Sequence, residues 1–280
     1  MIKRVNKQRC CPICGKSDWC GVAEDGSFAI CMRVMSDYQT ENEGWLHRLG
    51  EDQAQRWREF VITPKPKPNI NWHWLSLWCI KHCPEEKLQE FADELGVTQT
   101  SLRALRVGWH PKKKCWTFPM GKPVSPAGSY ELCGMQLRPP NGGRKFMVTH
   151  SESALFMAYM EESVEGWLCV TEGPTDTAAI HGLGFSVLGR AGSKSATKHI
   201  ERYFEMRPCY GREPSKVCII ADADKAGREG ADQLYEAIRR KVDRVSVIEP
   251  VGAKDAREWV RNGLTTDRLL RAIESRKVAA

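Results

Sequence analysis

Acidic side chains follow two apolar segments of strand type in the second half of this 280-residue chain. Glu172 comes after Trp167–Val170, and Asp222 and Asp224 come after Val217–Ile220. Each acidic segment is followed by a helical pattern, so its carboxylates lie where a strand passes into a helix. In a parallel α/β sheet the carboxyl ends of the strands meet at one edge, where ligands bind. Carboxylates gathered there repel one another unless a divalent cation lies between them, and hard oxygen ligands suit Mg²⁺ or Mn²⁺.

A single Asp-x-Asp pattern is more often a solvated loop than a metal site, but two acidic strand ends about 50 residues apart favour the metal. A third apolar segment, Arg244–Ile248, is followed by Lys254 and Asp255. Asp176 lies in the first turn of the helix that opens with Pro174. It is either a hydrogen-bonding partner behind the metal ligands or a favourable negative charge at a helix N-terminus.

The segment 189–195 invites comparison with a phosphate-binding loop. That motif requires G-x-x-x-x-G-K-[ST], and Ser193 occupies the position of its last glycine. Chemistry driven by ATP hydrolysis is therefore unsupported. Lys194 remains a candidate contact for a phosphate group, and Lys254 is a candidate to neutralise phosphate charge beside Asp255.

Positive charge is concentrated in one part of the chain. The net charge is +7, and residues 103–145 contain nine Lys or Arg against one acid, Glu131. A basic stretch beside an acidic metal site suits an enzyme that joins nucleotides. No apolar segment of about 18 residues occurs and the N-terminus lacks the apolar core of a signal peptide, so we expect no membrane span and a cytoplasmic location.

Five of the twelve cysteines lie between positions 10 and 31, and the Cys11-Pro-Ile-Cys14-Gly-Lys segment is typical of a zinc knuckle. Four thiolates satisfy tetrahedral Zn²⁺, and we select Cys11, Cys14, Cys20 and Cys31. Cys10 is the spare because it directly adjoins Cys11, although the choice between Cys10 and Cys20 stays open. The zinc is expected to be structural. The aromatic side chains of the segment are either its core or a surface for stacking bases, namely Trp19, Phe28 and Trp45.

Composition divides the chain into four parts. Residues 1–60 are predicted to be the zinc-binding ribbon, 61–70 a Pro/Lys linker, 71–165 a basic subdomain of mixed α+β structure, and 166–280 an α/β catalytic domain with a parallel sheet. Glu85–Leu95 has helical apolar spacing, and residues 96–105 complete a pattern of the helix-turn-helix kind. Such helix pairs more often serve as scaffolding than as readers of DNA sequence.

The E-G-x-x-D segment at 172–176 and the D-x-D-x-x-G segment at 222–227 resemble the Toprim domain of bacterial-type DNA primases, type IA and II topoisomerases, recombination mediators and some nucleases. Four ordered blocks resemble the primase subdomain that precedes Toprim: Trp116–Pro119, Gly134–Arg138, Arg144–Phe146 and Ser153–Phe156. The chain as a whole resembles a Toprim-type, bacterial or phage-like DNA primase with an N-terminal zinc module. It departs from the G-x-D-x-D pattern of that family, because Arg257 stands where the second acid is expected and Glu258 follows.

This resemblance implies synthesis of short RNA primers on single-stranded DNA from nucleoside triphosphates. Asp222 and Asp224 would hold two Mg²⁺ or Mn²⁺ ions with help from Asp255, and Glu172 would be a general base or a further ligand. Arg138 and Lys145 would line the cleft, the alternative being that Arg144 and Lys145 solvate a hairpin end. The rival functions are a Toprim nuclease and a non-catalytic single-strand binder. Because the sequence ends soon after the Toprim motifs, we expect a separate helicase partner in a phage, plasmid or mobile-element system.

Overall fold

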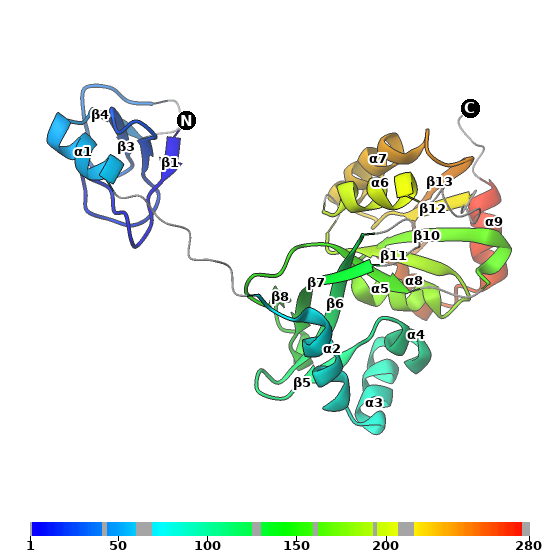
Figure 1. The fold of residues 1–280 in the computed structure, drawn as a ribbon. Helices are drawn as coiled ribbons and strands as arrows, with labels where there is room; N and C mark the ends of the chain where they lie inside the picture. The colour runs from blue at the N-terminus through cyan, green and yellow to red at the C-terminus, as the bar shows by residue number, and fades with distance from the viewer. Residues whose placement is uncertain are drawn as a thin grey trace. The chain divides into compact units, whose positions relative to one another are not determined.

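The computed structural model describes residues 2–40, 44–59, 69–124, 130–158, 162–192, 195–206 and 216–275. The chain forms two compact units, residues 1–67 and 68–280, and each is described by itself (Figure 1). Residues 61–68 of the predicted linker lie outside the described residues. In the described part of the chain, every helix is too short or too polar to cross a bilayer.

The first unit is a small antiparallel sheet with one helix. Its core is small, and buried cysteines make up half of it beside Val5, Val22 and Ala29. The strands pair in chain order, and the elements are β1 (Ile2–Arg4), β2 (Gly21–Ala23), β3 (Phe28–Cys31), β4 (Trp45–Arg48) and α1 (Glu51–Glu59). So few apolar side chains bury little surface, and a bound metal is the natural supplement.

The second unit is built on one mixed sheet with the strand order β13-β12-β10-β11-β9-β6-β7-β8, to which β5 is added beside β6. The four strands from β13 to β11 run parallel, and the others pair antiparallel. The bounds are β5 (Gly108–His110), β6 (Cys115–Pro123), β7 (Tyr130–Arg138), β8 (Phe146–Met147), β9 (Leu155–Ala158), β10 (Trp167–Glu172), β11 (Ser186–Arg190), β12 (Lys216–Ile220) and β13 (Arg244–Ile248).

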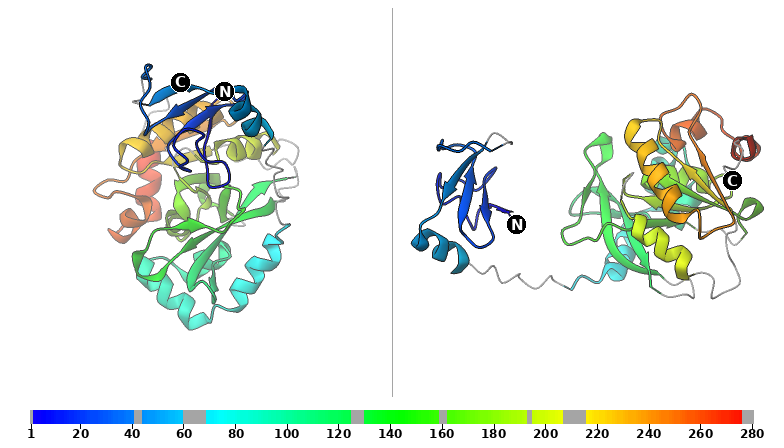
Figure 2. Two further views of the ribbon diagram at one scale, coloured as in Figure 1. Left: turned by 90° about the vertical axis from the view of Figure 1, so that its left-hand side faces the viewer. Right: turned by 90° about the horizontal axis from the view of Figure 1, so that it is seen from above.

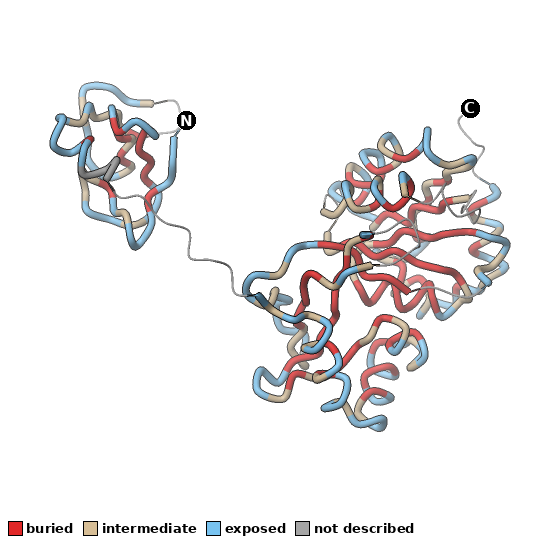
Figure 3. Tube along the Cα trace, in the orientation of Figure 1, coloured by how far each residue is buried: buried red, intermediate tan, exposed pale blue. Residues whose placement is uncertain are grey.

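The parallel strands are buried on both faces (Figure 3). Leu168 and Val170 of β10 pack with residues of α6 and α7, whereas Trp167 and Cys169 pack with residues of α5, α8 and α9. Two covered faces explain the continuous apolar runs in these strands. The helices are α2 (Trp72–Lys81), α3 (Glu85–Leu95), α4 (Gln99–Ala104), α5 (Gly173–His181), α6 (Thr197–Met206), α7 (Lys225–Ile238), α8 (Ala256–Arg261) and α9 (Thr266–Ser275).

The antiparallel part of the sheet is covered by different helices on its two faces, as Figure 2 allows the reader to follow. Trp116 and Phe118 of β6 pack with α3 and α4, whereas Cys115 of β6 and Leu137 of β7 pack with α2. One side of the six-residue helix α4 is buried, and there Ser101 Oγ lies 3.0 Å from His181 Nδ1 of α5. The predicted fold class, an α/β domain with a parallel sheet preceded by a mixed α+β subdomain and a cysteine-containing ribbon, is confirmed.

The end of β11 differs from the sequence prediction. A loop was expected from Gly189 onward, but β11 continues through Arg190. Gly189 pairs with Phe156 and Arg190 with Leu155 of β9. The partner strand prolongs β11, and local sequence carries no signal of that partner.

Candidate metal and nucleotide site

The two acidic strand ends lie side by side in the sheet. β10 and β12 pair directly in parallel, with Cys169 opposite Cys218, so Glu172 and Asp222 emerge at the same edge. A cavity of about 340 Å³ opens there. Of the residues predicted for the site, six line it: Arg138, Lys145, Glu172, Asp176, Asp222 and Asp255.

Burial and mutual repulsion raise the proton affinity of these acids. The pKa of Asp222 is raised to about 8, first by burial and then by the charges of Asp176 and Glu172. Burial and Asp255 raise the pKa of Asp176 to about 6. Burial also raises the pKa of Glu172, and Asp224 adds to this effect while Arg190 opposes it. Acids that resist ionisation together are expected where a divalent cation belongs.

The donor atoms fit a divalent cation. Glu172 Oε1 is buried and makes no hydrogen bond within the described part of the chain. Asp224 and Asp255 cap the helices α7 and α8, accepting hydrogen bonds of 2.7 Å from the backbone N–H groups of Gly227 and Glu258. Each cap uses one carboxylate oxygen and leaves the other available for a cation. Glu172 and Asp255 line the cavity, whereas Asp224 does not. Among the described residues only the cysteines form a compact set of metal-ligand atoms, so these carboxylates do not converge on one point.

Asp176 has a structural role that the sequence did not specify. Its Oδ1 accepts a hydrogen bond of 3.0 Å from the backbone N–H of Arg257, at the first turn of α8. The side chain therefore ties α5 to the helix that carries Asp255. A buried carboxylate in this position also contributes negative charge to the wall of the cavity.

Arg138 and Lys145 bring positive charge to the same cavity. Partial burial and the neighbouring Arg257 lower the pKa of Arg138, and partial burial and Arg138 lower the pKa of Lys145. Lys145 Nζ lies 3.9 Å from the point that a Cβ on Gly173 would occupy. Gly173 has φ +76°, a backbone conformation that suits glycine, and its lack of a side chain keeps this space open.

Several predicted residues stand apart from the cavity. Asp224, Arg144 and Lys254 are exposed and are not among the residues that line it. Lys194 lies outside the described residues.

Sequence reasoning missed two arginines. Arg190 is fully buried, with Nη2 3.7 Å from Glu172 Oε1 and Nη1 donating to the carbonyl oxygen of Gly230 in α7 at 3.2 Å. Arg257 lines the cavity beside Arg138 and Lys145. Arg257 could have been found from the sequence, because it stands at the acidic position of the G-x-D-x-D pattern. Arg190 gave no such signal, because the segment 189–195 was predicted to be a loop.

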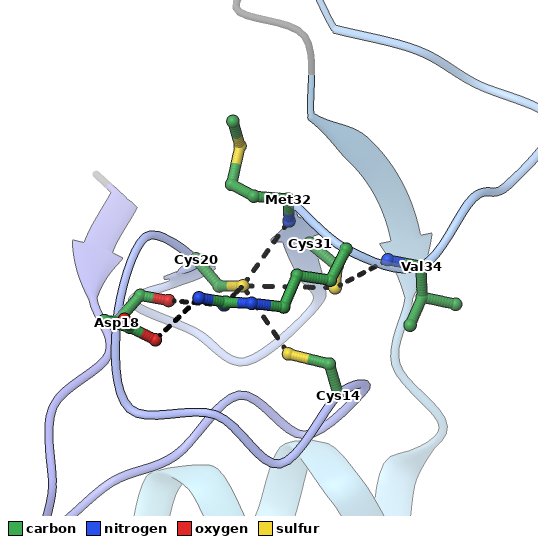
Figure 4. Close-up of polar contacts among 7 residues, drawn as sticks. Cys14, Asp18, Cys20, Cys31, Met32 and Val34 are labelled. Atoms are coloured by element: carbon green, nitrogen blue, oxygen red, sulfur yellow. Dashed lines mark hydrogen bonds and ion pairs between the residues drawn. The ribbon is translucent and has the colours of Figure 1, made fainter.

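The predicted cysteine cluster is present in the first unit. The Sγ atoms of Cys11, Cys14, Cys20 and Cys31 all lie within 4.8 Å of one another. Cys14 Sγ is 3.8 Å from Cys20 Sγ, and Cys20 Sγ is 3.9 Å from Cys31 Sγ (Figure 4). Four sulfurs about 2.3 Å from a central Zn²⁺ would be about 3.8 Å apart, so the cluster fits zinc. Cys10 is exposed and stands outside this cluster, whereas Cys20 is part of it.

Backbone and side-chain donors surround these sulfurs. Met32 N–H donates to Cys20 Sγ at 3.4 Å, and Val34 N–H donates to Cys31 Sγ at 3.3 Å (Figure 4). Arg33, held by Asp18 at 2.8 Å, points a further donor at Cys20 Sγ at 3.7 Å. Donors directed at sulfur stabilise its thiolate form, as a metal ligand requires.

A second and larger cavity, about 620 Å³, lies at the start of α2 between Trp72, His73, Arg106 and Tyr130. It includes one acid, Glu131, and none of the strand-end carboxylates. We therefore assign the chemistry to the smaller cavity.

The model of the Toprim domain family matches residues 167–250. This segment is a Toprim domain. It contains β10 to β13 and the acidic strand ends described above. Among curated proteins the comparison finds no match to this chain.

Solved structures of primases are similar to this chain. A DNA primase domain from Pseudomonas aeruginosa matches with a TM-score of 0.51 and 14% identity, covering 71% of this chain and 76% of that one. The zinc-binding and RNA polymerase domains of the Aquifex aeolicus primase match with a TM-score of 0.52 and 15% identity, covering 73% of this chain and 59% of that one. The primase fragment of the bacteriophage T7 primase-helicase protein matches over 96% of this chain and 98% of that one, with a TM-score of 0.45 and 16% identity.

The predicted resemblance to Toprim-type primases with a zinc module is therefore confirmed at the level of domain and fold. At these identities the matches to the Pseudomonas and Aquifex structures establish the fold of the second unit around its Toprim domain.

Proposed function

We propose that this protein is a DNA primase that synthesises short RNA primers on single-stranded DNA. The observation that carries the proposal is the shared cavity, in which Glu172 and Asp222 of the Toprim domain face Arg138 and Lys145 of the preceding subdomain. A Toprim nuclease would not need the basic subdomain that supplies Arg138 and Lys145. A wall of cations opposite them suits an enzyme that must also hold a triphosphate or a template.

In the proposed reaction the 3′-hydroxyl of one nucleotide attacks the α-phosphate of the next and pyrophosphate leaves. Two Mg²⁺ or Mn²⁺ ions, when bound, supply charge stabilisation to the entering and leaving oxygens. Asp222 and Asp224 would hold them, and Asp255 would assist. Glu172 has two roles open to it, acceptance of the hydroxyl proton or one more oxygen ligand. Arg138 would grip phosphate with its guanidinium fork, and Lys145 would act as a point charge.

The test is primer synthesis from labelled nucleoside triphosphates on single-stranded DNA of mixed sequence with Mg²⁺. We expect short labelled products from the wild type and a loss of about 100-fold or more in Asp222→Ala/Asp224→Ala. Asp232→Asn is the matched control, because Asp232 is an exposed acid on α7 that does not line the cavity. Degraded template in place of primers would favour the nuclease, and no reaction of either kind would favour a single-strand binding protein.

A replicative helicase supplied as a separate protein, in a phage, plasmid or mobile-element system, completes the proposal. Co-purification of the full chain with a co-encoded helicase, and stimulation of primer synthesis by it, would support this part.

A further inference from the structure

Helix α2 leaves a line of large apolar side chains exposed. Trp74 is 60% exposed, Leu77 48% and Ile80 37%, at a spacing of three residues along one side of the helix. The other side of α2 is used for packing, since Cys79 is buried against β6 and β7. When a helix is apolar on both sides and only one side is packed, its exposed apolar side marks a surface for interaction with a partner.

Aromatic rings continue from this line into the protein. Trp74 and Trp78 are nearly parallel, with an interplanar angle of 15° and ring centroids 6.3 Å apart. Trp78 contacts His82 at 4.6 Å and His110 edge-on at 5.3 Å between centroids. These ring contacts orient the Trp74 side chain, while much of its surface remains exposed to solvent. A base stacking on a ring held in this way would lose little of its binding energy to side-chain ordering.

Positive charge adjoins the same rings. The turn between β5 and β6 carries three exposed lysines, Lys112–Lys114. It is fixed to these rings because the Lys113 backbone N–H donates to His110 Nδ1 at 3.3 Å. Lys81 ends α2. Neither residues 69–83 nor residues 106–118 contain a single Asp or Glu. Exposed aromatic surface beside cations and without acids is the composition of a surface that binds single-stranded nucleic acid.

This surface is separate from the catalytic cavity. Leu137 of β7 packs on the α2 side of the sheet, and successive side chains of a strand point to opposite faces. Arg138 is paired with Trp116, which packs on the α3 side, and its guanidinium lies 5.9 Å from the ring of Phe91 in α3. The exposed rings of α2 therefore lie on the face of the sheet opposite to the cations of the cavity.

We propose that α2 and the 112–114 turn form a second nucleic-acid contact, in which an unpaired base of a single strand stacks on Trp74 and the lysines contact its phosphates. The inference rests on the proposed function only for the identity of the strand as template. The first unit of this chain is less suited to cover this surface than a nucleic acid is. Residues 1–60 contain nine Lys or Arg and nine Asp or Glu, so they carry no net negative charge to complement Lys81 and Lys112–Lys114.

The test is binding of a fluorescent single-stranded 20-mer to the full-length, zinc-loaded protein, measured by anisotropy over a range of salt concentrations. Trp74→Leu keeps apolar bulk and removes the aromatic face, so we expect affinity to fall about tenfold. Trp74→Phe is the matched control and should stay within about twofold of the wild type. Replacement of Lys112, Lys113 and Lys114 by Ala should lower the slope of log affinity against log salt by about 2.

A second readout identifies the contact directly. A strand carrying 5-iodouracil should cross-link on irradiation to the tryptic peptide that contains Trp74. Wild-type affinity in Trp74→Leu together with an unchanged salt slope in the lysine variant would overturn the proposal. Equal losses in Trp74→Leu and Trp74→Phe, without a cross-link at Trp74, would also overturn it. The binding and cross-linking readouts need no primer synthesis, so a failure of primer synthesis is distinguishable from a failure of this surface.

Discussion

At the scale of single residues, the site depends on charges that are placed inside the protein. Arg190 is buried, yet it bridges the strand end that carries Glu172 and the helix α7 that begins after Asp224. A buried cation in this position fixes the direction of the Glu172 carboxylate while it offsets part of the repulsion among the acids.

Arg190→Gln should therefore lower kcat for primer synthesis by about 10- to 100-fold. The KM for nucleotide should change by less than about twofold, since Arg190 is not among the residues that line the cavity. Arg190→Lys retains the charge and should recover part of the rate. Steady-state kinetics test this, with the thermal unfolding midpoint as a control for folding. A rise in KM at constant kcat would contradict a role in positioning Glu172.

A second prediction at this scale concerns Asp222 in protein freed of Mg²⁺. Its pKa is about 8 in the folded protein and near 3.8 when unfolded, so the folded state holds the extra proton between these values. The contribution of Asp222 to the free energy of unfolding is therefore greatest below about pH 4 and is lost as the pH rises towards 8. The thermal midpoint of the second unit should fall between pH 6 and 8.5 more steeply in the wild type than in Asp222→Asn. Added Mg²⁺ should stabilise more at pH 8.5 than at pH 6. Equal pH slopes in the two proteins would refute this.

At the scale of elements, the site is assembled at contacts between helices and strands that are distant in sequence. The hydrogen bond from Arg257 N–H to Asp176 joins α5 to α8 and so sets the place of Asp255. Removal of the acceptor leaves a backbone N–H without its partner.

Asp176→Ala should thus lower the free energy of unfolding by about 1–3 kcal/mol. For a domain of this size each kcal/mol shifts the midpoint by about 2–4 °C. Asp176→Asn keeps an oxygen acceptor and should lose less. Urea unfolding of the three proteins side by side measures the difference, and equal stabilities of Ala and Asn variants would show that the hydrogen bond does not hold α8.

The sequence predicted these elements where local pattern decides them. Arg244–Ile248 and Glu85–Leu95 have the predicted bounds, because an apolar run or an amphipathic period is visible without its partner. The sequence also predicted that Glu172 and Asp222 lie at the same edge of the sheet, since the carboxyl ends of parallel strands meet there. The position of Arg190 in a strand could not be predicted, because β11 is prolonged by its pairing with β9. The link from Asp176 to Arg257 joins residues 81 positions apart, and no local pattern encodes it.

At the scale of the whole molecule, the two units are stabilised by different physics. The second unit is stabilised by four apolar clusters on the faces of a sheet. The first unit has a few small apolar side chains and four cysteines whose sulfurs fit one Zn²⁺. A structural zinc site supplies roughly 10 kcal/mol or more in such modules, which is comparable to the whole stability of a small domain.

Removal of zinc should therefore unfold the first unit and leave the second intact. We expect two transitions in calorimetry of the zinc-loaded protein, of which a chelator abolishes one and shifts the other by less than about 2 °C, a change of about 1 kcal/mol or less. Cys14→Ser should reproduce the effect of the chelator. Cys10→Ser should retain one zinc per chain and both transitions, because Cys10 is exposed and outside the cluster. If the chelator instead moved both transitions together, the stability of the second unit would depend on the metal, and the two units would unfold as one.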